Sequence, residues 1–364
     1  MSGLLERTVA AIAEPDTTSA DAVQAQLDQK TKPRGSLGGL ERLAVRIAAI
    51  QRTATPSLGT PVVVVCAADH GVAAEGVSAY PSSVTAQMVA NYAAGGAAVS
   101  VLARRAGARL VVVDCGVAEP LPVPGVLDRR LGPGTASMLS GPAMTREQAL
   151  AALETGITLA TEELGGAGCV ALGEMGIGNS TAAAALTCAL AGATPEQACG
   201  RGTGIDDEGL ARKRDVVARA LTRMREHGVR PANPGSDPEF PLDPVAVLAE
   251  VGGFELGVLA GLALGAVSRN IPVVIDGYPA SAAALVAAAL APALPASLIA
   301  AHRSSEPGHA LVLAKLGLHP LLDLDLRLGE GSGAALALPL LGAALAILDE
   351  MATFASAGVD DSGR

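Results

Sequence analysis

The chain has 364 residues, 50% of them hydrophobic, and a net charge of −10 at pH 7, so it is long and apolar enough to bury a large core. Nucleic-acid binding needs a basic surface and aromatic stacking, and the acidic balance with 2% aromatic residues argues against it and for a small-molecule partner. The five cysteines form no CxxC pair and the N-terminus has early acids, so we expect buried thiols in a reducing cytoplasm and no signal peptide.

The predicted elements begin with a helical N-terminal region. Residues 1–50 place Leu40, Leu43 and Ile47 at helical spacing behind a glycine-rich interruption at 35–39. Short, continuous apolar runs follow, and such runs are typical of strands buried on both faces. These strands are predicted at 61–68, 110–116, 168–173, 272–277 and 297–301.

Helical patterns separate and follow these strands. They are predicted at 82–105, 181–190 and 332–357, the last with a kink at Pro339, and a Pro- and Asp-rich loop is predicted at 231–244. Strands that alternate with helices indicate an α/β fold with a parallel sheet covered on both faces. Such sheets bind ligands at the carboxyl ends of their strands. The polar residues expected there are Asp69, Asp114, Glu174, Asp276 and His302.

The hydropathy of the chain does not require a membrane. Mean hydropathy is +0.40, and the long uncharged stretches are 76–103 and 277–301. A spanning helix needs roughly 20 strongly apolar residues. The first stretch is broken by Pro81, and the second is mostly alanine and contains Pro292 and Pro295. We therefore expect buried helices of a soluble protein and no membrane partner.

A glycine-rich loop at Gly173–Thr181 follows a predicted strand and opens a helix. Glycines allow a tight turn whose N–H groups converge, and the positive end of a helix favours phosphate. The spacing approaches that of a P-loop, but Asn179 stands in place of the lysine, which favours a monophosphate over ATP. A tight turn without a ligand is the alternative.

A second glycine-rich segment, 200–207, precedes a helix that carries Lys213. Arg201 and Lys213 could supply the positive charge that the first loop lacks. An exposed turn before a solvated helix is the alternative, and the sequence does not decide between them.

Two glutamates are candidates for chemistry. Glu330 is flanked by glycines and opens an apolar helix, which suits a general base, although it could instead only favour the helix N-terminus. Glu174, inside the first glycine-rich loop, would repel phosphate unless it contacts a cationic part of the ligand or faces solvent. His70 has no nucleophile elbow beside it, and the five histidines lack ligand spacing, so no metal site is expected.

Taken together, these motifs resemble the nicotinate-nucleotide–dimethylbenzimidazole phosphoribosyltransferase family from about residue 30 to residue 357. One departure is Ser180, where the family usually has threonine, and the hydroxyl is kept. The matching segments are 30–38, 68–72, 142–145, 173–181, 202–207, 250–255, 276–279, 302–309 and 328–334.

The resemblance implies a fold and a reaction. The fold is a Rossmann-like domain at 61–333 with a smaller helical domain formed by 1–60 and 334–364, in a homodimer. Nicotinate mononucleotide gives its 5-phosphoribosyl group to 5,6-dimethylbenzimidazole, which yields α-ribazole 5′-phosphate and nicotinate in cobalamin biosynthesis. Because the cationic pyridine nitrogen of the donor leaves as a neutral ring, no metal and no cofactor are expected.

By family position, Glu330 is the general base in a reaction with inversion at C1′, and Glu174 is a second acid near the reacting groups. The implied phosphoribosyl contacts are Gly176, Gly178, Asn179, Ser180, Thr181, Gly202, Lys213 and Ser304. The implied contacts of the acceptor base are Ser78, Tyr80, Gln87 and Met88.

Two other functions remain open from the sequence. The chain could be another nucleotide:base phosphoribosyltransferase, which substrate profiling with benzimidazoles and purines would reveal. It could also be a non-catalytic nucleotide-binding regulator, which would bind nicotinate mononucleotide and release no nicotinate.

Overall fold

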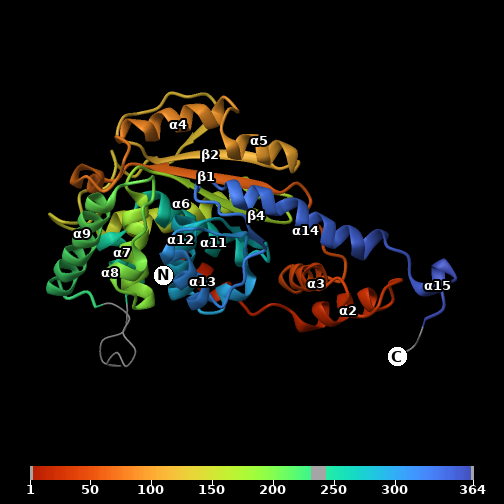
Figure 1. The fold of residues 1–364 in the computed structure, drawn as a ribbon. Coiled ribbons are helices and arrows are strands. Elements are labelled where there is room, and N and C mark those ends of the chain that lie inside the picture. Colours follow the sequence, from red (N-terminus) through yellow and green to blue (C-terminus); the bar gives the residue numbers. More distant parts are fainter. Residues whose placement is uncertain (1–2, 231–242, 362–364) are drawn as a thin grey trace.

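The computed structural model describes residues 3–230 and 243–361 of the chain (Figure 1). Its centre is a six-stranded parallel sheet with the strand order β3-β2-β1-β4-β5-β6. This is the order of doubly wound nucleotide-binding sheets. The strands are β1 (Val62–Ala68), β2 (Arg109–Gly116), β3 (Val126–Asp128), β4 (Val170–Met175), β5 (Val273–Ile275) and β6 (Leu298–Ala300).

The sheet confirms the α/β fold and the five predicted strands. Every residue of β1 is buried, because helices cover both faces of the sheet and its apolar run meets a core on each side. Val64 and Cys66 belong to one core, whereas Val63 and Val65 belong to the other. The short strand β3 was not predicted, and neither was the two-stranded sheet of β7 (His302–Arg303) and β8 (Leu322–Asp323).

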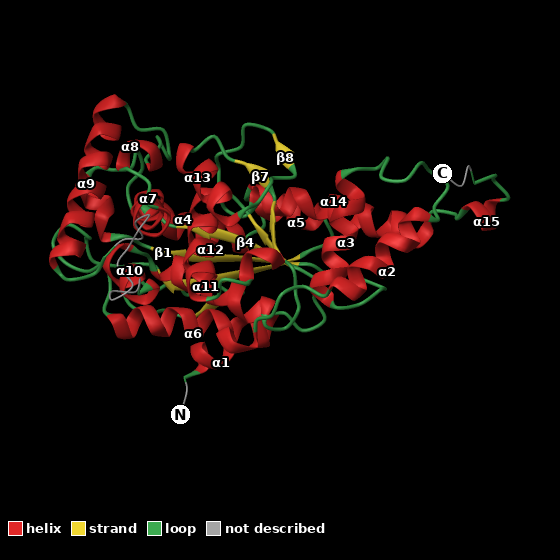
Figure 2. Cartoon of the chain, turned by 90° about the horizontal axis from the view of Figure 1, so that it is seen from below, coloured by secondary structure: helices red, strands yellow, loops and turns green. Residues whose placement is uncertain are grey.

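Two layers of helices enclose the sheet (Figures 1 and 2). The first layer is α4 (Ser83–Ala93), α5 (Ala98–Arg105) and α14 (Ser332–Glu350), and α2 (Thr17–Asp28) and α3 (Gly39–Gln51) pack on α14 beyond the sheet. The second layer is α1 (Leu4–Ala11), α6 (Arg146–Glu163), α7 (Asn179–Ala191), α9 (Asp207–Glu226), α10 (Pro244–Val251), α11 (Phe254–Val267), α12 (Tyr278–Leu290) and α13 (Pro307–Leu316). The short elements are η1 (Gly71–Glu75), α8 (Pro195–Ala198), η2 (Leu294–Ser297) and α15 (Phe354–Ala357).

Two helix predictions need correction. The single helix predicted at 82–105 is two helices, because Gly95 adopts a left-handed conformation and the chain turns between α4 and α5. The helix predicted at 332–357 continues through Pro339 but ends at Glu350. A separate short helix, α15, follows it. Most of the predicted loop 231–244 lies outside the described residues.

The division into two domains stays a prediction. The helices α2 and α3 pack beside α14, as a unit formed by both chain ends requires, and Figure 1 shows them at one end of the molecule. The helix α1 packs instead against α6 and α11 on the other face of the sheet.

Within the described residues, α14 is the one helix whose length and composition would allow it to span a membrane. In the fold, 56% of its apolar window is buried. The helix therefore serves as a core element of the first helical layer.

Candidate functional site

The candidate site lies where β1 and β4 end side by side. The chain order in the sheet reverses between these two strands, because β1 leads outward to β2 and β3 on one side and β4 leads to β5 and β6 on the other. Open α/β sheets bind their ligands at this switch point. His70 follows β1, Glu174 lies in β4, and Asp276 follows β5.

Glu330 sits in an unusual turn directly above the end of β4. Gly329, Glu330 and Gly331 all have left-handed backbone angles, with φ of 81°, 66° and 84°. This conformation is costly for a non-glycine residue, and such outliers cluster at functional sites. The turn packs against β4 so closely that no side chain fits between them. A Cβ at Gly173 would lie 2.5 Å from the Glu330 carbonyl oxygen. The turn thus fixes the position of the Glu330 carboxylate.

Asp276 stabilises this turn through two hydrogen bonds. Its Oδ2 accepts the N–H of Gly331 at 3.1 Å, and its Oδ1 accepts the N–H of Ala334 at 2.8 Å, which caps the first turn of α14. His302 stands beside the same carboxylate, with Nδ1 3.7 Å from Oδ1. Asp276 therefore has a positioning role that its isolated place in the sequence did not suggest.

The electrostatics of Glu330 suit a base at neutral pH. Burial raises the pKa of Glu330 to about 6, the neighbouring Tyr92 phenol lowers it, and the charge of Asp276 adds to the rise. At pH 7 the carboxylate is therefore mostly ionised, yet it is a stronger proton acceptor than an exposed glutamate. The residue is 7% exposed, and its Oε2 is buried without a hydrogen-bond partner among the described residues.

Glu174 has the opposite character. It is buried, which excludes the solvent-facing alternative considered from the sequence. Burial and then the charge of Asp276 raise the pKa of Glu174 to about 8, while a short hydrogen bond from the Asn179 side-chain amide opposes the rise. The carboxyl group is thus mostly neutral at pH 7 in the free protein, and it need not repel a phosphate.

A separate group of side chains can bind an anion. Lys213 is fully buried on α9, and its Nζ donates to Ser180 Oγ at 3.0 Å and to the Gly200 carbonyl at 3.2 Å. A Cβ at Gly202 would lie 2.8 Å from Ser180 Oγ and 3.3 Å from Lys213 Nζ. The three residues therefore converge, and Lys213 supplies the charge that Asn179 cannot. Arg201 pairs instead with Asp207 on the exposed side.

The first turn of α7 offers fewer free amides than the sequence suggested. The N–H of Asn179 donates to the Gly176 carbonyl at 3.0 Å, and that of Thr181 donates to the Gly178 carbonyl at 2.9 Å. The Thr181 hydroxyl is buried and has no hydrogen-bond partner within the described residues. An anion at this turn would therefore be bound by Lys213, the Ser180 hydroxyl and the remaining backbone N–H groups.

Ser304 and Glu306 lie beside this group. The Ser304 N–H donates to His309 Nδ1 at 2.9 Å, and the Glu306 N–H donates to Ser304 Oγ at 3.3 Å. Glu306 Oε1 accepts the N–H of Gly202 at 2.8 Å and so fixes the second glycine-rich segment. Glu306 was not among the predicted site residues.

Of the four residues predicted for the acceptor base, Ser78 contacts the second glycine-rich segment directly. Ser78 Oγ lies 3.2 Å from Thr203 Oγ1, which ties the 78–80 segment to the second glycine-rich segment. Tyr80 is 53% exposed. Gln87 is exposed on α4, and Met88 is half-buried against the core beneath it.

Sequence reasoning missed Tyr92. The residue is buried on α4, and its phenol neighbours Glu330 and Glu174, whose charges add to burial in raising the pKa of Tyr92 well above its usual range. A signal was available, because Thr85, Met88 and Tyr92 share one face at helical spacing. Thr85 Oγ1 accepts the Ile177 N–H at 3.2 Å, so this face of α4 meets the first glycine-rich loop.

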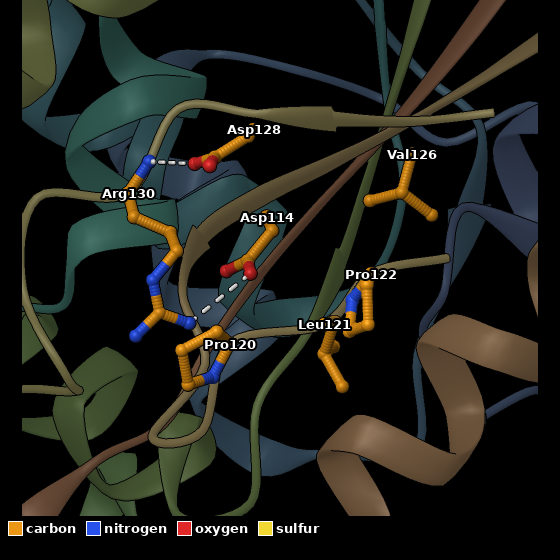
Figure 3. A pocket seen from close by; sticks show the side chains of 7 residues that line it. All are labelled: Asp114, Pro120, Leu121, Pro122, Val126, Asp128 and Arg130. Carbon is orange, nitrogen blue, oxygen red and sulfur yellow. Dashed lines mark hydrogen bonds and ion pairs between the residues drawn. The ribbon is translucent and has the colours of Figure 1, made fainter. Parts of the chain in front are cut away.

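A surface pocket near the outer strands is separate from these residues (Figure 3). It is lined by Asp114, Pro120, Leu121, Pro122, Val126, Asp128 and Arg130. Asp114 pairs with Arg130 at 3.3 Å and accepts the N–H groups of Gly116 and Val117. Asp114, expected among the ligand-binding residues, therefore organises the end of β2. In the part of the chain that the structure describes, no cluster of three His, Cys, Asp or Glu residues could hold a metal.

The chain is similar to known proteins over nearly its whole length. A family model described as "Phosphoribosyltransferase" matches residues 12–359. A protein of Roseiflexus sp. (strain RS-1), named nicotinate-nucleotide–dimethylbenzimidazole phosphoribosyltransferase, is 52% identical over 358 residues, 98% of each chain. A protein of Chloroflexus aggregans with the same name is 51% identical over 360 residues, 98% of each chain. The crystal structure of CobT from Thermus thermophilus has a TM-score of 0.87 and 51% identity, over 95% of this chain and 100% of that chain.

Proposed function

The chain belongs to the phosphoribosyltransferase family of these relatives, and we propose that it transfers the 5-phosphoribosyl group of nicotinate mononucleotide to 5,6-dimethylbenzimidazole in cobalamin biosynthesis. One observation of the structure carries the proposal. The left-handed turn at Gly329–Gly331 presents the Glu330 carboxylate over the end of β4, beside the buried Glu174. In the free protein at pH 7, a Glu330 pKa of about 6 and a Glu174 pKa of about 8 give the site one ionised base and one uncharged acid.

The proposed reaction needs a single base. A benzimidazole nitrogen attacks C1′ with its lone pair, and the bond from C1′ to the pyridine nitrogen breaks with its electrons moving onto that nitrogen. The nicotinate ring leaves without protonation, because its nitrogen was cationic in the donor. Glu330 accepts the N–H proton of the benzimidazole. Attack opposite the leaving group inverts C1′, and holding both rings about one ribose supplies much of the acceleration.

The donor's phosphate would bind at Ser180, Gly202 and Lys213, where a fully buried ammonium group meets a hydroxyl and a close backbone. The turn around the ribose would be formed by Gly176, Gly178, Asn179 and Thr181. Ser304 would lie next to the phosphate contacts, because its Oγ accepts the Glu306 N–H and Glu306 in turn accepts the N–H of Gly202. Glu174 would lie near the cationic pyridine ring, which gives a reason for a buried carboxyl in this loop.

The acceptor would lie against Ser78, Tyr80, Gln87 and Met88. The exposure of Tyr80 supports a place at the mouth of the site. Apolar contacts discriminate a methyl group by only about 1–3 kcal/mol, so we expect related benzimidazoles to react as well.

We also propose that the protein is a cytoplasmic homodimer. The apolar helix α14 leaves Leu336, Leu340 and Ile347 only half-buried within one chain, and a second copy would cover them. Sedimentation equilibrium tests this state, and a monomer at micromolar concentration would contradict it.

Nicotinate release tests the proposed reaction. Purified protein with nicotinate mononucleotide should release nicotinate only when 5,6-dimethylbenzimidazole is added, with an equal amount of α-ribazole 5′-phosphate. A purine that replaces the benzimidazole at equal rate would point to a different nucleotide:base phosphoribosyltransferase. Binding of the donor without any release would point to a regulator.

A further inference from the structure

A buried histidine–glutamate pair lies beneath the first glycine-rich loop and has no part in the proposed chemistry. His70 follows β1, and Glu255 lies in the first turn of α11. His70 Nε2 and Glu255 Oε1 are 2.8 Å apart, and the two side chains are 1% and 0% exposed. A buried polar pair of this kind costs desolvation and is poor evidence of stability, so another role is expected.

The ring of His70 is enclosed by backbone. A Cβ at Gly176 would lie 3.2 Å from Nε2 and Cδ2 of His70, and one at Gly178 would lie 3.3 Å from the His70 Cβ. On the far side, a Cβ at Gly253 would lie 2.3 Å from Cε1. The loop at 176–178 therefore rests directly on the imidazole, which is itself held between the loop and the start of α11.

The pair has one fixed hydrogen bond and two unused polar atoms. His70 Nδ1 and Glu255 Oε2 are buried and have no hydrogen-bond partner within the described residues. Glu255 is thus the one described polar side chain that fixes which way the ring nitrogens point, within the space that the backbone leaves. If Glu255 is changed, no other polar group among the described residues holds the imidazole against the loop.

From this geometry we propose that His70, oriented by Glu255, is a positioning residue for the phosphoribosyl donor. It acts through the backbone of Gly176 and Gly178 and touches neither substrate. The inference rests on the proposed function, because that function places the donor's ribose and phosphate on this loop. It predicts that the pair affects donor binding and leaves acceptor binding unchanged.

Variants of Glu255 test the proposal without altering the loop. Glu255→Gln keeps an oxygen that accepts from His70 Nε2, and Glu255→Leu removes it. We expect Glu255→Leu to raise the Kd and KM for nicotinate mononucleotide about tenfold or more, since small misplacements of bound groups are costly. The KM for 5,6-dimethylbenzimidazole should stay within about twofold, and Glu255→Gln should restore most of the donor affinity. His70→Ala should reproduce the effect of Glu255→Leu.

Glu250→Gln is the matched control. Glu250 precedes Glu255 in the same segment and is also buried, but it pairs with Arg223 at 2.5 Å, away from the loop. The Kd of the Glu250→Gln variant for nicotinate mononucleotide should equal that of the wild type. The proposal is overturned if Glu255→Leu keeps wild-type donor affinity, if the KM values for both substrates rise alike, or if Glu250→Gln gives the same loss.

Direct binding of the donor, measured by calorimetry without acceptor, keeps this test separate from turnover. If His70→Ala does not fold, the comparison of Glu255→Leu with Glu255→Gln still decides. If the wild type binds the donor but never releases nicotinate on addition of the acceptor, the proposed function fails. The positioning role alone fails if the wild type turns over and any of the three overturning outcomes named above is found.

Discussion

Replacement of Glu330 by glutamine is the sharpest test of the proposed chemistry. The amide keeps the size of the side chain and its place in the turn, but it cannot accept the benzimidazole proton. General-base catalysis contributes about 10²–10⁴-fold, which corresponds to roughly 3–5 kcal/mol of transition-state stabilisation. We therefore expect kcat to fall by that factor, while the Kd for nicotinate mononucleotide stays close to the wild-type value, because Lys213 and Ser180 are untouched.

The pH dependence of the wild type gives an independent measure of the same base. Since the pKa of Glu330 is raised to about 6, the reactive carboxylate dominates above pH 6 and is lost by protonation below it. The rate kcat/KM should therefore fall about tenfold per pH unit on the acid side of pH 6. Nicotinate release followed by chromatography at several pH values measures both effects. Wild-type turnover by Glu330→Gln would refute the assignment of Glu330 as the base.

Three further predictions concern the surroundings of this base. Tyr92→Phe removes the phenol that lowers the pKa of Glu330, so the acid limb of kcat/KM should move above pH 6; an unmoved limb would show that the phenol has no influence. Lys213→Met should raise the KM for nicotinate mononucleotide about tenfold or more with little effect on the acceptor, and equal effects on both substrates would contradict the phosphate assignment. Gly173→Ala should reduce kcat well below that of the wild type while the protein still folds, because its Cβ would displace the Glu330 backbone; unchanged kcat would show that the turn yields freely.

The parts of the fold that the sequence predicted are those with a local signal. A strand such as β1 is an unbroken apolar run because both of its faces are covered, and the run is visible without any knowledge of its neighbours. The strand β3 is only partly buried, unlike the equally short β5 and β6, and the break between α4 and α5 depends on a turn inside an apolar stretch. Neither leaves a periodic pattern long enough to recognise.

The candidate site likewise has some features with a local signal in the sequence and others without one. The glycines around Glu330 and in the first loop were visible because close backbone approach demands them locally. Two other features could not be predicted, because both join residues that are far apart in the chain. They are the hydrogen bond from the Gly331 N–H to Asp276 and the pairing of His70 with Glu255. Their side chains meet only because the sheet order brings β1, β4 and β5 together.

The neutral state of Glu174 has a consequence for how the donor binds. A carboxyl group whose pKa is about 8 in the free protein holds a proton at pH 7, and a cationic ring placed beside it would lower that pKa and release the proton. Donor association would then be linked to proton uptake by the buffer, and the donor would bind more tightly as the pH rises toward 8. Calorimetry in buffers of different ionisation enthalpy would detect this transfer, and a binding heat independent of the buffer would mean that Glu174 keeps its proton. In such a site, the positive charge on the pyridine ring of the donor would itself set the ionisation state of Glu174 in the complex.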